Sequence, residues 1–236
     1  MKLSCLAFVA MTLTAGILPS LASAQSVELG ATATPLVAPA CPAGVSQADC
    51  TIVLTQVTAL ETIRDGVTYP TTVRKAGMLT GFTVGVSALS SDAATVKQDE
   101  TFLSSTYGGA AEAQITVLRP VGKRADFRWT VAAQSPPEQL EPYLGQVVEF
   151  PFANNLPVVP GETIALTVPT WAPVLSFDLP TAKFAYRQSR KSKCAQPAAA
   201  LQAQLTIGEN TQYGCDYPGT RVEYTATEIL SPTPNS

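Results

Sequence analysis

The sequence contains no histidine among its 236 residues. Histidine is the proton carrier of Ser–His–Asp and Cys–His active sites, so its absence excludes nucleophilic hydrolases of those kinds. The nucleophile motif G-x-S-x-G is also missing, because residues 85–89 are GVSAL and lack the last glycine. No S-x-x-K motif occurs either. The sequence therefore contains no motif that pairs a serine nucleophile with a base, which favours a protein that is not an enzyme.

Motifs for metals and cofactors are missing as well. A calcium loop needs alternating oxygen ligands, and no D-x-D-x-D run occurs. Glycine-rich loops that hold phosphates are absent. A zinc site is excluded because the cysteines form no C-x-x-C pairs and no histidine can replace them. We therefore expect no metal and no cofactor.

Only the start of the chain has a long apolar run. Residues 1–24 begin with a basic Lys2, continue with an apolar run over 6–18, and end in Ala-Ser-Ala at 22–24. This pattern is typical of a secretory signal peptide that is cleaved before Gln25. The apolar run is too short and too interrupted for a retained membrane anchor. We therefore expect a secreted, extracellular protein with no membrane insertion after signal cleavage.

Charged residues are few, at 14%, and acids are in slight excess. Cleavage removes Lys2 and no acid, so the net charge changes from −3 to −4. A mildly acidic surface gives no reason to expect nucleic acid or an anionic membrane as a partner. The basic run over 187–193 is interpreted as a solvated loop, with a polyanion-binding patch as the alternative.

Four cysteines remain in the exported chain, namely Cys41, Cys50, Cys194 and Cys215. An even number of cysteines in an exported protein predicts disulfides, and three pairings are possible. Loop closure favours the local pairs Cys41–Cys50 and Cys194–Cys215. The chain-entropy model gives about 2.7 kcal/mol for the first pair and about 3.4 kcal/mol for the second.

Two segments in the middle of the chain show alternating apolar and polar residues. Residues 113–120 and 126–133 have the period of two that is typical of strands buried on one side. A short polar connection with a glycine at 121–124 predicts that they form a hairpin. We expect Trp129 in the core. The apolar members of the pattern are Ile115, Val117, Phe127, Trp129 and Val131.

Nineteen prolines and fifteen glycines predict many turns and few long helices. We expect one all-β domain over residues 41–230, an antiparallel β-sandwich of jelly-roll type with about nine or ten strands and two disulfides. A flexible leader is expected over 25–40 and a disordered tail over 231–236. Residues 91–109 are predicted to form the longest loop, and short helices are expected only at 140–145 and 195–204.

Glycine and proline residues in two further predicted strands indicate how these strands lie relative to neighbouring segments. Gly81 and Gly85 lie on one face of the strand predicted over 78–88, which indicates a bend or the close approach of another segment. Pro151 interrupts the strand over 146–152. Proline cannot donate a hydrogen bond to a neighbouring strand, so this strand is predicted at the edge of a sheet.

The order of several motifs resembles a family of exported β-sandwich proteins of unassigned function that is common in actinobacteria. The motifs are Cys41-Pro42, AGMLTGF at 76–82, ITVLRP at 115–120, Phe150-Pro151 and LPVVPGETIAL at 156–166. The chain differs in having Phe82 where the family pattern has tryptophan and Arg74 where it has proline. The resemblance implies a sandwich and export, and it supplies no catalytic residues.

Candidate ligand-binding residues are aromatic side chains in turn-like surroundings. Trp171 lies near a proline, Tyr107 precedes two glycines, and Tyr213 precedes Gly214-Cys215. Such rings can stack on a sugar, or they can pack against the sheet instead. The first hypothesis is therefore a non-enzymatic secreted module, binding or structural, whose extracellular ligand is a carbohydrate or a protein.

The alternative hypothesis is a glycoside-active enzyme, because glycoside hydrolysis needs paired carboxylates and no histidine. The candidate pairs are Asp99 with Glu100, Glu138 with Glu141, and Glu149 with Glu162. Spacing along the chain does not show whether any pair faces across a cleft. A pair of carboxyl groups across a groove would favour this alternative, and solvated acids would oppose it.

Overall fold

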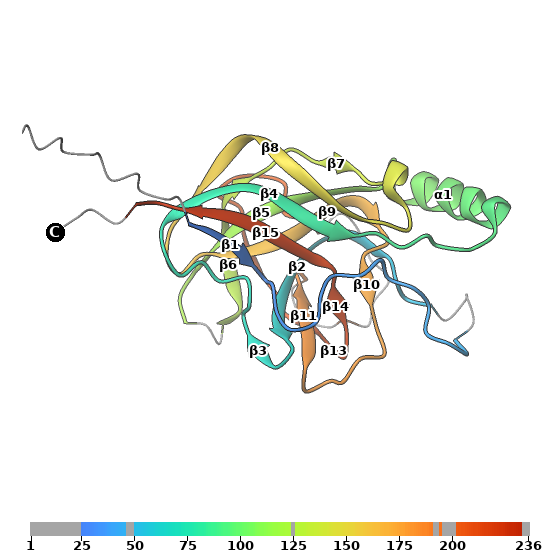
Figure 1. The fold of residues 1–236 in the computed structure, drawn as a ribbon, viewed down its shortest axis with the longest axis horizontal. Helices are drawn as coiled ribbons and strands as arrows, with labels where there is room; N and C mark the ends of the chain where they lie inside the picture. Colours follow the sequence, from blue (N-terminus) through green and yellow to red (C-terminus); the bar gives the residue numbers. More distant parts are fainter. Residues whose placement is uncertain (1–24, 46–49, 124–125, 191–193, 195–201, 233–236) are drawn as a thin grey trace, which may run out of the picture.

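The computed structural model describes residues 25–45, 50–123, 126–190, 194 and 202–232. The predicted signal peptide, most of the helix expected at 195–204, and residues 233–236 of the expected tail lie outside this part of the chain. Antiparallel strands are the main regular structure of the described residues, which confirms the all-β class (Figure 1). They form fifteen strands, more than expected, because several are only two to four residues long.

The eight longer strands are β2 (Leu54–Arg64), β4 (Gly77–Gly85), β5 (Glu112–Pro120), β6 (Arg128–Gln134), β8 (Val147–Val158), β9 (Thr163–Ala172), β11 (Phe184–Gln188) and β15 (Tyr224–Leu230). The seven short strands are β1 (Ser26–Leu29), β3 (Val67–Thr68), β7 (Glu138–Gln139), β10 (Leu175–Ser176), β12 (Asn210–Gln212), β13 (Cys215–Pro218) and β14 (Arg221–Val222). The helices are α1 (Ala93–Tyr107) and a 3₁₀ turn, η3 (Glu141–Tyr143), which lies where a helical turn was predicted at 140–145.

Two sheets face each other across the main core. A four-stranded sheet has the order β1-β15-β4-β8, and a larger, curled sheet has the order β12-β6-β5-β9-β2-β11-β13. The main core contains Phe82 and Tyr224 from the smaller sheet and Ile115 and Leu166 from the larger one. The hairpin predicted over 113–133 is confirmed as β5 paired with β6. β8 lies at a sheet edge, as Pro151 predicted.

The larger sheet is buried on both faces, which differs from the one-sided burial expected for the central hairpin. Its second face has a row of threonine hydroxyls, in which Thr167 lies 2.9 Å from Thr58 and 2.6 Å from Thr116. A segment that includes Gln204 and Tyr213 covers this face, and Gln134 donates to the Gln204 carbonyl at 2.7 Å. Polar residues were expected in solvent here, but hydrogen bonds between them allow their burial.

The expected flexible leader over 25–40 is wrong at its start, because Ser26–Leu29 forms β1 and pairs with β15. The expected loop over 91–109 is also wrong, because Ala93–Tyr107 is the helix α1. Asp92 caps its start by accepting from the Thr95 N–H at 2.7 Å, and Gly108 ends it at a φ of 85°. The helix has no fully buried residue. It therefore lacks the apolar stripe that predicts a helix, and only its caps indicate it.

Candidate functional site

The structure buries two of the three rings that the sequence singled out for binding. Trp171 is fully buried, and its Nε1–H lies 3.1 Å from the Gly109 carbonyl and 3.3 Å from the Ser104 hydroxyl. The expectation that this ring is freely presented is wrong, because the indole donates its hydrogen bonds to the C-terminal end of α1.

Tyr213 is also fully buried. Its hydroxyl donates to Gln204 Oε1, and its ring packs edge-on against Trp129, with centroids 5.0 Å apart. The expectation of a presented ring is wrong here too. Trp129 is in the core as predicted. Tyr107 is half-buried at the end of α1 and packs against the main core.

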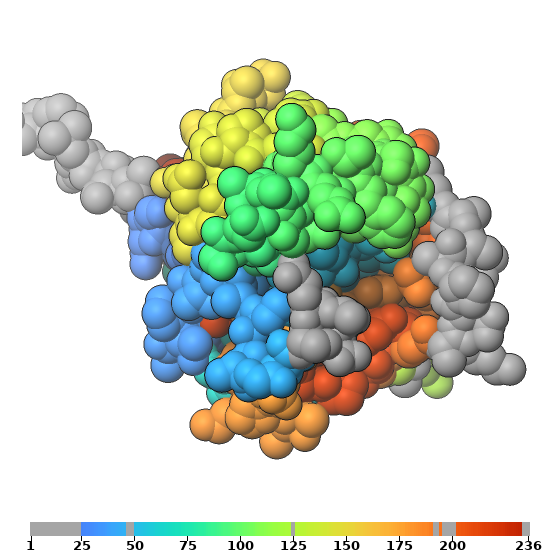
Figure 2. Space-filling model, turned by 90° about the vertical axis from the view of Figure 1, so that its right-hand side faces the viewer, coloured from blue at the N-terminus to red at the C-terminus, as the bar shows by residue number. Residues whose placement is uncertain are grey.

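A cavity of about 780 Å³ lies elsewhere, at one end of the larger sheet. The start of β2, the loop after β10, and strands β11 and β13 form its walls. Figure 2 shows the chain before β2 in blue beside the loop after β10 in orange and the β13 region in red. These segments are far apart in the sequence, so no local motif marks the cavity.

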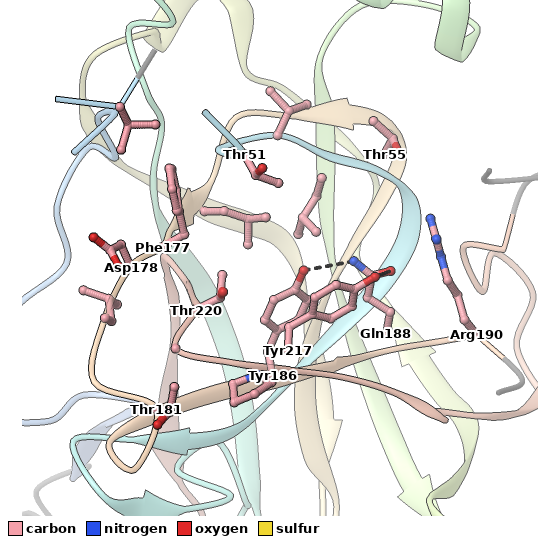
Figure 3. A pocket seen from close by; sticks show the side chains of 17 residues that line it. Thr51, Thr55, Phe177, Asp178, Thr181, Tyr186, Gln188, Arg190, Tyr217 and Thr220 are labelled. Atoms are coloured by element: carbon pink, nitrogen blue, oxygen red, sulfur yellow. Dashed lines mark hydrogen bonds between the residues drawn. The ribbon is translucent and has the colours of Figure 1, made fainter. Parts of the chain in front are cut away.

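Two tyrosines dominate one wall of this cavity (Figure 3). Tyr186 on β11 and Tyr217 on β13 are register partners, and their rings stack with centroids 4.9 Å apart and an interplanar angle of 12°. Tyr186 is buried and Tyr217 is half-buried. The amide of Gln188 donates to the Tyr186 hydroxyl at 2.9 Å and accepts from the Tyr217 hydroxyl at 3.4 Å. One amide therefore orients both phenols.

Both phenols stay protonated at neutral pH. Burial raises the pKa of Tyr186 and of Tyr217, and the Arg190 guanidinium opposes this without reversing it. A protonated phenol both donates and accepts a hydrogen bond, so it suits a ligand rich in hydroxyl groups.

Irregularities in the strands shape the cavity. The register of β2 against β9 shifts between Thr55 and Val57, where Gln56 has a φ of 48°. Beside this shift, the consecutive residues Val53, Leu54 and Thr55 all line the cavity. Such bulges redirect side chains next to functional sites. The period of two in the sequence does not reveal an extra residue of this kind.

The remaining polar lining is mostly hydroxyl groups, with one acid and one base. The threonines are Thr51, Thr55, Thr181 and Thr220. Asp178 and Arg190 lie on opposite sides of the cavity in Figure 3. Asp178 is exposed and is the single carboxylate among the described residues that line this cavity.

The candidate carboxylate pairs do not meet in the cavity. Asp99 and Glu100 are in α1, Glu138 is in β7 and Glu141 in η3, and Glu149 is exposed on β8. Glu162 is buried and forms an ion pair with Arg119 at 2.7 Å. A two-carboxylate hydrolase needs its acids across one cleft, and the described lining of this cavity supplies only Asp178.

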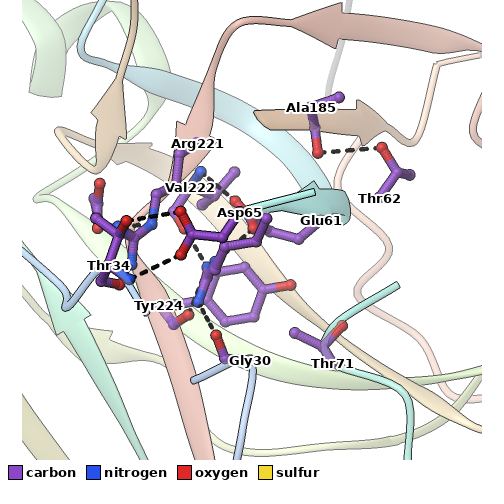
Figure 4. A network of polar contacts seen from close by, with 12 residues as sticks. Gly30, Thr34, Glu61, Thr62, Asp65, Thr71, Ala185, Arg221, Val222 and Tyr224 are labelled. Carbon is purple, nitrogen blue, oxygen red and sulfur yellow. Dashed lines mark hydrogen bonds and ion pairs between the residues drawn. The ribbon is translucent and has the colours of Figure 1, made fainter. Parts of the chain in front are cut away.

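A second polar cluster, which is buried, has a structural role (Figure 4). The Arg64 Nε–H donates to Glu61 at 2.7 Å, and the other nitrogens of Arg64 donate to the carbonyls of Gly30, Val222 and Tyr224. Burial acts to lower the pKa of Arg64, but the Glu61 carboxylate raises it above its ordinary value. Because every nitrogen of this guanidinium has a partner, the cluster stabilises the fold and leaves little capacity for a ligand.

The neighbouring Asp65 holds the segment before β2. It accepts from the backbone N–H of Thr34 at 2.8 Å and from the Thr34 hydroxyl at 2.7 Å. Desolvation acts to raise the pKa of Asp65, but hydrogen bonds from Thr32 and Thr34 and the charge of Arg221 lower it to about 2. The carboxylate therefore stays ionised, and keeps this contact, in mildly acidic solution.

The two disulfides are Cys41–Cys50 and Cys194–Cys215, which confirms the predicted local pairing. They indicate that the protein folds in an oxidising compartment. Within the described residues, no helix is long and apolar enough to span a membrane, and no cluster of three or more cysteine or acidic side chains could hold a metal ion.

Comparisons with models of protein families, with curated proteins and with solved structures find no match.

Proposed function

We propose that the protein is a secreted, non-enzymatic binding module of jelly-roll type that holds a carbohydrate in the cavity at Tyr186 and Tyr217. The single observation that carries this proposal is the stacked tyrosine pair whose two hydroxyls share the Gln188 amide. Sugars present apolar C–H faces and many hydroxyl groups. The cavity offers the matching chemistry in its rings, its amide and its threonines.

Export of the protein is part of this proposal. It is supported by the two disulfides and by the signal-peptide pattern of residues 1–24. The resemblance to exported actinobacterial β-sandwich proteins agrees with it.

The test is binding of the purified, exported protein to an array of neutral and acidic glycans, followed by calorimetric titration of those retained. Tyr217→Ala removes the half-buried ring, and we expect it to weaken binding about tenfold or more, as for an aromatic contact worth about 1.5 kcal/mol. Tyr217→Phe keeps the ring and should lose less. Tyr107→Ala is the matched control, because Tyr107 is also half-buried but lies outside the cavity.

Retention of no glycan would overturn the proposal, and so would an equal loss of affinity in Tyr217→Ala and Tyr107→Ala. Shortened products in a bound oligosaccharide after incubation would show the glycoside-active alternative. Binding of a protein ligand through this cavity, with no glycan bound, would also contradict the carbohydrate assignment.

A further inference from the structure

Arg190 differs from the other arginines that are buried or half-buried in the described residues. Arg190 forms no ion pair within that part of the chain. Its Nε is buried without a hydrogen-bond partner, as is the Nε of Arg221, but Arg221 has the Glu223 carboxylate beside it. The others have an acid partner, in the pairs Arg64–Glu61 at 2.7 Å, Arg187–Asp216 at 3.5 Å and Arg221–Glu223 at 3.2 Å.

Arg190, which has no acid partner in the described residues, lies where a ligand in the cavity could contact it. It is the second residue after β11, lines the cavity, and lies beside Gln188 and Tyr217 in Figure 3. An N–H group that is removed from water without an acceptor destabilises the fold. The planar guanidinium presents parallel N–H groups that match the two oxygens of a carboxylate.

The charges around the cavity favour an anion only at the end where Arg190 lies. Asp178, the single described acid in the lining, lies on the opposite side in Figure 3. Asp216 is engaged by Arg187, whose guanidinium also lies 3.7 Å from the centre of the Phe127 ring. Among the described residues, no acid in the lining therefore lies beside the positive charge of Arg190.

We infer that the cavity takes an acidic sugar, a uronic acid residue, with its carboxylate on Arg190 and its ring against Tyr217. This inference rests on the proposed carbohydrate function and adds the substrate class. A neutral sugar would satisfy the tyrosines and Gln188 but would bring no negative charge to the guanidinium.

The test compares a galacturonic acid oligosaccharide with its fully methyl-esterified form, which has the same length and linkage but no charge. Calorimetric titration should show the free acid binding about tenfold or more tightly than the ester, with a preference that decreases as salt rises. Arg190→Gln should abolish the preference for the acid, and it should weaken binding of the ester much less than binding of the acid. Arg190→Lys keeps the charge but loses the paired N–H groups, and it should retain part of the preference.

Arg128→Gln is the matched control, because Arg128 is exposed and does not line this cavity. Equal binding of acid and ester, or a preference that survives Arg190→Gln, would overturn the inference and leave the proposed carbohydrate function standing. Binding of a sulfated sugar in place of the uronate would also overturn it. Failure of every neutral and acidic glycan to bind would overturn both proposals.

Discussion

At the scale of single residues, Glu228 is an acid whose surroundings disfavour its charged form. Glu228 on β15 is 1% exposed, and its Oε1 has no hydrogen-bond partner within the described residues. Gly77 lies against it, since a Cβ at that position would be 2.6 Å from Glu228 Oε1. Burial raises the pKa of Glu228. The folded protein therefore holds the proton of this carboxyl group more tightly than the unfolded chain does.

This burial predicts a pH-dependent effect of Glu228→Gln. Below the unfolded-state value of about 4.3, Glu228 is neutral in both states and its burial carries no charge penalty. As the pH rises through the higher folded-state pKa, the native state must bury an ionised carboxylate, and stability is lost. The amide cannot ionise, so the advantage of Glu228→Gln over the parent should increase from pH 4 to pH 8.

Urea unfolding at both pH values measures this advantage. Glu149→Gln, on the exposed side of β8, is the control and should show no such increase. A difference in unfolding free energy between Glu228→Gln and the parent that is constant with pH would contradict the prediction.

At the scale of elements, the close approach that the sequence predicted beside β4 is confirmed. A Cβ at Gly85 would lie 1.8 Å from the Val37 carbonyl oxygen, and one at Gly81 would lie 2.8 Å from the Phe150 carbonyl oxygen. The segment that contains Val37 is held in place, because Arg221 donates to the carbonyls of Thr34 and Pro35. A side chain at Gly85 therefore meets backbone that cannot move easily.

We expect Gly85→Ala to destabilise the fold by about 1–3 kcal/mol, the usual range for overpacking. Hydrogen exchange should become faster in residues 31–37, because the new methyl group displaces that segment. The measurement is urea unfolding combined with exchange mass spectrometry. Thr83→Ser, a small change on the same strand, is the control. Unchanged exchange over 31–37 in Gly85→Ala would contradict the packing described here.

At the scale of the whole molecule, the Arg64 cluster links parts of the fold that are distant in sequence. Arg64 is on β2 of the larger sheet, Tyr224 is on β15 of the smaller sheet, and Gly30 follows β1. Both Arg64 and Glu61 are fully buried. Removing one member of a buried ion pair leaves the other charge without compensation, which is strongly destabilising.

Arg64→Met should therefore lower the free energy of unfolding by about 3–5 kcal/mol. The double variant Glu61→Gln/Arg64→Met removes both charges and should recover part of that loss. Chemical denaturation of the two variants and the parent gives both values. A loss of less than about 1 kcal/mol in Arg64→Met would show that this cluster does not connect the sheets energetically.

The sequence predicted those parts of the structure that depend on local pattern and composition. Alternation gave the β5–β6 hairpin, loop closure gave the two disulfides, and the proline at 151 gave an edge strand. Helix α1 was missed because no apolar stripe accompanies its caps. Strand β1 was missed because its stability comes from pairing with the distant β15.

The candidate site could not be predicted in the same way. The aromatic residues chosen from turn-like surroundings were mostly buried, because Trp171 and Tyr213 find hydrogen-bond partners inside the protein. The cavity depends on the pairing of β11 with β13 and on a register shift in β2, and neither leaves a periodic signal.

By itself, the sequence determined the all-β class, the pairing of the cysteines and the lack of histidine chemistry, because period, loop length and composition are local properties. Only the tertiary structure decided which tyrosines form the cavity wall and which of the buried or half-buried arginines in the described residues has no acid partner. Those outcomes depend on long-range strand pairing, which brings Tyr186, Tyr217 and Arg190 together.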